Sequence, residues 1–131
     1  MSYYIAQKMT LPFDEAVTAT VAALQAEGFG ILTEIDVAAT LKKKLDVDFR
    51  PYRILGACNP PFAHQALQAE DKIGLMLPCN VIVQETVDGD IEVAAIDPLA
   101  SMQAVGNPAL AHIGTEVRDK LARVIASLGG K

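Results

Sequence analysis

Cys58 is the side chain whose setting in the sequence favours reactivity most. It follows an apolar run and precedes Asn59-Pro60-Pro61. Asparagine followed by proline is typical of a helix start, because asparagine caps free N–H groups and proline tolerates the first helical position. A thiol beside a helix N-terminus feels its positive end, which lowers the thiol pKa and favours the thiolate. Since His64 falls about one turn further along, we predict Cys58 and His64 as candidate catalytic residues.

Further ligand types occur in two other segments. Cys79 opens a predicted strand, and Glu34 and Asp36 lie at the end of an earlier one. Thiol, imidazole and carboxylate groups bind metal ions or form nucleophile–base pairs. The sequence therefore allows a site for a small molecule or a metal ion, without indicating which metal or cofactor it would hold.

Core packing is the alternative role for both thiols. In an extended strand Cys58 shares a face with Ile54, whereas Cys79 shares one with Val81 and Val83. Free cysteine is among the most buried residue types and often serves as a small hydrophobic group. Both thiols are therefore explained without any reactivity.

The other candidates also have structural alternatives. A lone histidine such as His64 more often bonds locally than binds metal, and Asp36 is placed to cap a helix. His112 lies four residues before Glu116, where a surface ion pair is the simplest role. The sequence contains no Gly-rich phosphate loop, G-x-S-x-G elbow, H-E-x-x-H or C-x-x-C motif. No motif of established chemistry therefore decides between the alternatives.

Apolar periodicity predicts the elements that position these side chains. Strand-like and helix-like segments follow one another, with proline or glycine between several of them. Asp88-Gly89 between two β-rich runs indicates a hairpin, because glycine tolerates the positive φ of a tight turn. Residues 97–106 are expected to form a loop. The predicted strands are 3–9, 29–35, 52–58, 79–87 and 91–96, and the predicted helices are 13–28, 36–45, 60–70 and 107–128.

This order predicts an α+β domain with a twisted, largely antiparallel sheet. The first and last helices carry apolar stripes, so both are expected to pack on one face of the sheet. The other face then needs a cover, which a homodimer or the short middle helices would supply. With no linker, repeat or low-complexity tract, residues 1–131 are expected to form one domain.

Composition excludes several function classes. The 131-residue chain has 11 basic and 16 acidic residues, a net charge of −5 and 51% hydrophobic residues. Nucleic-acid binding is disfavoured, since it needs a clustered basic face and the longest basic run is Lys42-Lys43-Lys44. No apolar run approaches the roughly 20 residues that span a bilayer, and no targeting segment is visible. We therefore expect a cytoplasmic protein that binds neither nucleic acid nor membrane, with reduced cysteines.

Four stretches of the chain resemble one prokaryotic family, the domain-of-unknown-function family 302. They are EIDV at 34–37, YRILGACNPP at 52–61, AHQAL at 63–67 and IGLMLPCNVIV at 73–83. The resemblance implies a compact α+β domain arranged like the TATA-binding-protein-like folds, often a homodimer, with no established activity. The family's motif positions imply candidate ligand-binding residues, namely Glu34, Cys58, Asn59, His64, Cys79 and Asn80.

Three functions remain open at this point. The first is a small-ligand or metal-binding module with a site around Cys58 and His64. The second is an enzyme that uses Cys58 as a nucleophilic or redox thiol. The third is an assembly protein whose sheet face serves only association. A nucleophile needs an accessible thiol of low pKa, and a metal site needs at least a third converging ligand.

Overall fold

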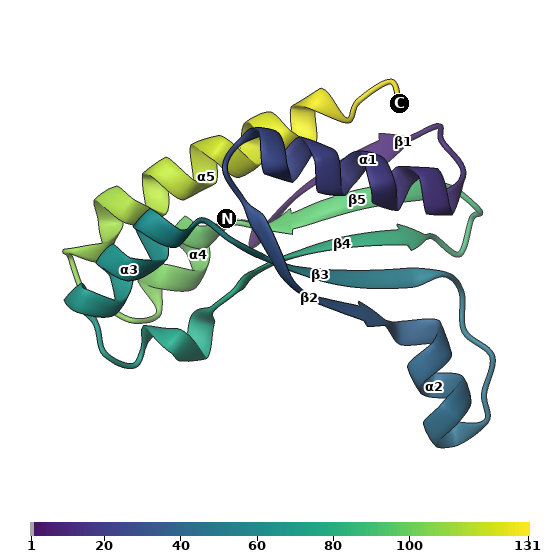
Figure 1. Cartoon of the computed structure of the whole chain (residues 1–131), viewed down its shortest axis with the longest axis horizontal. Coiled ribbons are helices and arrows are strands. Elements are labelled where there is room, and N and C mark those ends of the chain that lie inside the picture. The colour runs from purple at the N-terminus through teal and green to yellow at the C-terminus, as the bar shows by residue number, and fades with distance from the viewer. Residues whose placement is uncertain (1) are drawn as a thin grey trace.

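One antiparallel sheet organises the chain, as Figure 1 shows for the computed structural model, which describes residues 2–131. Its five strands lie in the order β1-β5-β4-β3-β2, and every neighbouring pair is antiparallel. This confirms the predicted α+β class. The strands are β1 (Tyr4–Met9), β2 (Gly30–Asp36), β3 (Tyr52–Cys58), β4 (Cys79–Glu85) and β5 (Ile91–Ile96). The helices are α1 (Phe13–Ala26), α2 (Val37–Leu45), α3 (Pro60–Ala69), the 3-10 turn η1 (Ile73–Met76), α4 (Pro98–Gln103) and α5 (Leu110–Ser127).

The hairpin between β4 and β5 forms at the predicted place. Gly89 has a φ of +88°, which a residue with a Cβ adopts only with strain, and Val83 pairs with Val93 across the two strands. The alternation of side chains along these strands sends Val81, Val83 and Val93 to the same buried face. The hairpin thereby forms the centre of the core.

The long helices α1 and α5 cover one face of the sheet (Figure 1). Apolar residues recur along α5 every three or four positions, and this stripe is buried against the strands. On α1 the buried Thr20 hydroxyl donates a hydrogen bond of 2.7 Å to the carbonyl of Ala16, so its burial leaves no unpaired group. The buried residues of α5 are Leu110, Ile113, Gly114, Val117, Leu121, Val124 and Ile125.

No helix of the described chain covers the second face of the sheet. The helices α3 and α4 contact α5 and so lie on the face that α1 and α5 occupy. The helix α2 projects past the end of the sheet (Figure 1), and none of its residues is buried. The face opposite α1 and α5, here called the open face, carries Tyr52, Ile54, Ile82, Gln84 and Ala94. The middle helices therefore do not supply the cover that the sequence analysis considered.

The prediction of a loop over residues 97–106 is wrong, because α4 occupies most of this segment. Asp97 caps this helix: its side chain accepts a hydrogen bond of 3.0 Å from the Leu99 N–H and one of 3.1 Å from Arg118 Nε. Burial leaves only 6% of Asp97 exposed, so both donors compensate the desolvated carboxylate. Asp97-Pro98 is the same cap-and-proline signal that marks other helix starts, and here it opens a single short helix.

None of the helices between residues 2 and 131 is long and apolar enough to cross a membrane.

Candidate functional site

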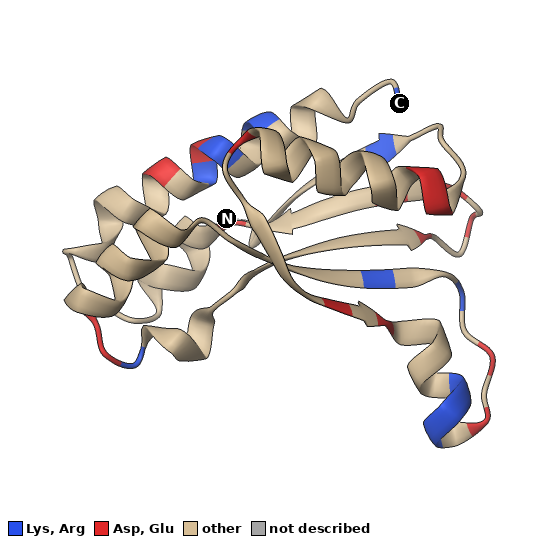
Figure 2. Cartoon of the chain, viewed as in Figure 1, with Lys and Arg blue, Asp and Glu red and all other residues tan. Residues whose placement is uncertain are grey.

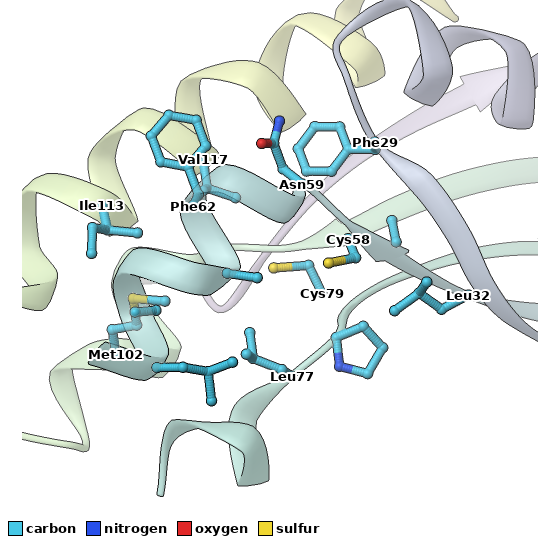
Figure 3. A pocket seen from close by; sticks show the side chains of 15 residues that line it. Phe29, Leu32, Cys58, Asn59, Phe62, Leu77, Cys79, Met102, Ile113 and Val117 are labelled. Atoms are coloured by element: carbon cyan, nitrogen blue, oxygen red, sulfur yellow. The ribbon is translucent and has the colours of Figure 1, made fainter. Parts of the chain in front are cut away.

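An apolar pocket of about 280 Å³ lies where β3 ends and α3 begins (Figure 3). Its walls come from the end of the sheet, from α3, and from segments far away in the sequence. A cavity of this size approaches the lower end of the range of about 300–1,000 Å³ typical of small-molecule sites. The lining residues are Phe29, Leu32, Ala57, Cys58, Asn59, Phe62, Ala63, Ala66, Leu67, Leu77, Pro78, Cys79, Met102, Ile113 and Val117.

Local sequence explains how the wall at β3 is built. Asn59 leaves the strand in an extended conformation, and Pro60 occupies the first turn of α3, so the chain turns at once from strand to helix. The Asn59 side chain, which the sequence predicted as a cap, makes no hydrogen bond to the N-terminus of α3. Instead Asn59 Nδ2 donates to the Glu27 carbonyl at 3.5 Å, which links this corner to the turn after α1.

Gly56 allows Pro78 to approach the sheet beside the pocket. A Cβ placed on Gly56 would lie 2.8 Å from Pro78 Cγ and would clash with the side chain of Thr33. Real Cβ atoms do not approach other atoms so closely, so a larger residue at position 56 would displace Pro78. The glycine therefore leaves the room that the segment leading into Cys79 occupies.

Both cysteines are free thiols, each half-buried, and both line this pocket. Ala57 of β3 pairs with Cys79 of β4, so Cys58 lies one residue further along the neighbouring strand. Burial raises the pKa of the Cys79 thiol from its ordinary value of 9.0 to about 11, and the nearby charge of Cys58 adds to this effect. Cys79 is therefore protonated at neutral pH, which makes it a poor nucleophile.

Alkylation of Cys79 by iodoacetamide in a Cys58→Ser variant should reflect this raised pKa. We expect the rate to stay low through neutral pH and to rise only as the pH approaches about 11, since burial is the larger cause and persists in the variant. The same protein in denaturant is the control, and its thiol should titrate near 9.0. Equal rates for the folded and denatured protein near neutral pH would show that Cys79 is not buried.

The same shift links Cys79 to stability. A folded-state pKa above the unfolded value stabilises the fold while the thiol keeps its proton. This contribution is fully present below about 9 and is lost as the pH rises through about 11.

The structure gathers three of the candidate residues, Cys58, Asn59 and Cys79, at the pocket. His64 does not line it and is exposed on another side of α3. Asn80 is exposed and lines a shallow depression on the open face.

The two carboxylates belong to a separate ion-pair group. Glu34 accepts a hydrogen bond of 3.0 Å from Arg53 Nη1, and Asp36 lies 3.5 Å from Arg53 Nε. Asp36 also caps α2 by accepting the Ala39 N–H at 2.9 Å, as its position in the sequence indicates. Neither carboxylate lines the pocket.

Much of the pocket wall consists of apolar residues that the sequence analysis did not single out as a site. On α3, Phe62, Ala63 and Ala66 face the cavity together, which is the spacing of one helix face. That face is visible in the sequence, but its role is not, because Met102 and Ile113 complete the wall only after the chain has folded.

The pocket and the two short helices beside it carry no charged side chain. Figure 2 shows α3 and α4 without a single Lys, Arg, Asp or Glu, and no such residue lines the pocket. Across residues 2–131 there is also no group of three or more His, Cys, Asp or Glu side chains placed to hold a metal ion. The arrangement thus offers an apolar surface, two thiols and one amide to a bound molecule.

Comparison with known proteins identifies relatives of the whole chain. The family described as "Domain of unknown function DUF302" matches residues 5–128. A solved structure, "Crystal structure of uncharacterized conserved protein DUF302 from Bacillus stearothermophilus", is similar with a TM-score of 0.91 and 26% identity, covering 98% of this chain and 99% of that chain. No curated protein matches the chain. These relatives bring no activity with them.

Proposed function

Since the chain belongs to the DUF302 family, whose description assigns no function, we propose one from the pocket: the protein binds a small, uncharged, mainly apolar molecule there. The observation that carries the proposal is the lining itself, a cavity of about 280 Å³ with apolar walls and no charged side chain. Several lining residues, such as Phe29, Ala57 and Val117, also belong to the hydrophobic core, yet the packed side chains leave this space between them. Such a space is the usual form of a ligand site.

The lining favours uncharged ligands for a physical reason. A charged group entering an apolar cavity loses its hydration and finds no counter-charge, whereas apolar surface gains about 25 cal/mol for each Å² removed from water. Burial has this effect on the protein's own groups, since it keeps the Cys79 thiol protonated. A neutral molecule with one hydrogen-bonding group suits the pocket, because Asn59 is part of its lining and an amide side chain can donate or accept a hydrogen bond.

The same geometry favours binding over catalysis by Cys58. A cysteine that transfers a group in each catalytic cycle needs a neighbouring base to move the proton, and His64, the base that the sequence offered, does not line the pocket. Cys79, the other titratable group in the wall, holds its proton too firmly to serve as a base near neutral pH. Binding requires none of these groups.

A pocket-filling substitution tests the proposal with the neutral fluorophore N-phenylnaphthylamine as probe. Wild-type protein should bind the probe with a rise in fluorescence, and Ala63→Phe should weaken binding by at least about tenfold, since the new ring occupies the cavity. Ala69→Phe is the matched control, because Ala69 is exposed on the same helix and does not line the pocket. It should bind like wild type.

Circular dichroism establishes whether each variant folds. If Ala63→Phe does not fold, Ala63→Leu fills part of the pocket with a smaller side chain. Absence of probe binding by wild-type protein would contradict the proposal. Equal affinities of folded wild-type and Ala63-substituted proteins would contradict it as well, because the probe would then bind elsewhere.

A further inference from the structure

The two cysteines of the chain are neighbours across a strand pair. Cys79 pairs with Ala57, so Cys58 lies one position along the adjoining strand. Strands about 4.8 Å apart with a rise of about 3.3 Å per residue place the two Cα atoms roughly 6 Å apart. Disulfides join Cα atoms separated by about 4.4–6.8 Å, so the backbone already has a suitable spacing.

The side chains also meet this requirement, although strict alternation along a sheet would send them to opposite faces. β3 ends at Cys58, directly before the chain turns into α3, and at this end of the strand pair both Cys58 and Cys79 line the pocket. Figure 3 shows both sulfur atoms directed into the same part of the pocket. The charge of Cys58 contributes to the raised pKa of Cys79, as two neighbouring thiols require.

We propose that Cys58 and Cys79 are a redox pair that forms a reversible disulfide across the ends of β3 and β4 when a peroxide enters the pocket. The Cys58 thiolate attacks one peroxide oxygen, the O–O bond breaks, and Cys58 becomes a sulfenic acid, while the departing hydroxide takes up a proton from the solvent and leaves as the first water. The Cys79 sulfur then attacks the Cys58 sulfur. The S–S bond forms, the S–O bond breaks, and the Cys79 proton leaves with the hydroxyl group as the second water.

The environment explains both the order of the steps and the stability of the products. Cys79 keeps its proton near neutral pH, so Cys58 is the thiol that reacts first and Cys79 the one that resolves. The final disulfide is uncharged, so it places no unpaired charge in the apolar pocket. A dithiol reductant reverses the reaction by exchange.

Intact-mass measurement after hydrogen peroxide treatment of the reduced protein tests this pair. We expect the mass to fall by two hydrogen atoms, peptide mapping to join Cys58 to Cys79, and dithiothreitol to restore the starting mass. Single variants separate the roles: dimedone should label Cys58 in Cys79→Ser at least about tenfold more than Cys79 in Cys58→Ser, because thiolate is the form that reacts. Separate oxidation of both thiols without a link, or disulfides only between molecules, would overturn the proposal.

A second experiment rests on the proposed function and tests whether the ligand and the two thiols occupy the same pocket. If a ligand fills the pocket, N-phenylnaphthylamine should slow disulfide formation in wild-type protein but not in Ala63→Phe, which excludes it. Disulfide formation that the probe leaves unchanged would contradict the location of ligand binding while the redox pair stands. Absence of the Cys58–Cys79 link with normal probe binding would overturn the redox pair alone.

Discussion

Replacing Leu121 with alanine is expected to lower the free energy of unfolding by roughly 2–5 kcal/mol, as is typical of a large-to-small change in a packed core. Leu121 is 0% exposed and lies in the middle of the apolar stripe of α5, which packs against the sheet. Removing its side chain loses apolar burial and leaves a cavity that the sheet and α1 cannot fill by a local shift. Urea titration monitored by circular dichroism measures the loss.

The matched control is Lys43→Ala, because Lys43 is exposed on α2 and makes no described ion pair. A change at such a position usually alters stability by less than about 0.5 kcal/mol. Small and equal losses for both variants would show that α5 is not docked on the sheet.

Substituting Ile82 with aspartate is expected to turn a dimer into a monomer. We propose that the open face joins two copies of the chain, since no helix of residues 2–131 covers it. Its centre carries Ile54, Ile82 and Ala94, and Ile35 beside them is 45% exposed. An apolar centre of this kind is what the core of a stable interface requires.

A row of polar side chains lies at one end of this centre. Arg50 donates from Nε and Nη2 to Gln84 Oε1 at 3.3 Å, and Gln84 Nε2 donates to Glu92 Oε1 at 2.9 Å. Beyond the sheet edge α2 projects with Leu45 65% exposed, so it offers further apolar contact to a second copy. An apolar centre beside hydrogen-bonded polar side chains matches the usual anatomy of interfaces.

Light scattering at micromolar concentration should give about twice the chain mass for wild-type protein, which is the size of a symmetric dimer. Ile82→Asp should raise the dissociation constant at least about a hundredfold, because it buries an unpaired carboxylate. Val87→Asp is the control, since Val87 is 86% exposed at the hairpin tip. A wild-type monomer would contradict the proposed dimer, and so would dimers of unchanged affinity in Ile82→Asp.

Local patterns in the sequence sufficed to predict most of the fold. The turn at Asp88-Gly89, the stripe of α5 and the cap at Asp36 each depend on neighbouring residues, and each forms at the predicted place. The short helix α4 was missed because its stability comes from outside its own segment. Arg118 of α5 compensates the buried Asp97 carboxylate, and that contact exists only in the folded chain.

The candidate site was harder to predict than the fold. The sequence grouped Cys58 and Cys79 as candidate ligands by residue type and by family resemblance, but alternation along each strand does not give the register between the two strands. The pairing of Ala57 with Cys79 brings both thiols to the wall of the pocket. His64 was placed near Cys58 by its spacing, but the face of α3 that lines the pocket is set by Phe62 and Ala66. Which face of a helix lines a pocket depends on tertiary contacts with residues far away in the sequence.

Ligand binding in the pocket is tested most directly by a methyl-NMR titration of the wild-type protein with N-phenylnaphthylamine. We expect the methyl resonances of Leu77, Ile113 and Val117, which line the pocket, to shift with saturation, while those of Ile54 and Ile82 on the open face stay in place. Shifts confined to Ile54 and Ile82, or no saturable shift at all, would contradict the proposal that this pocket is the ligand site.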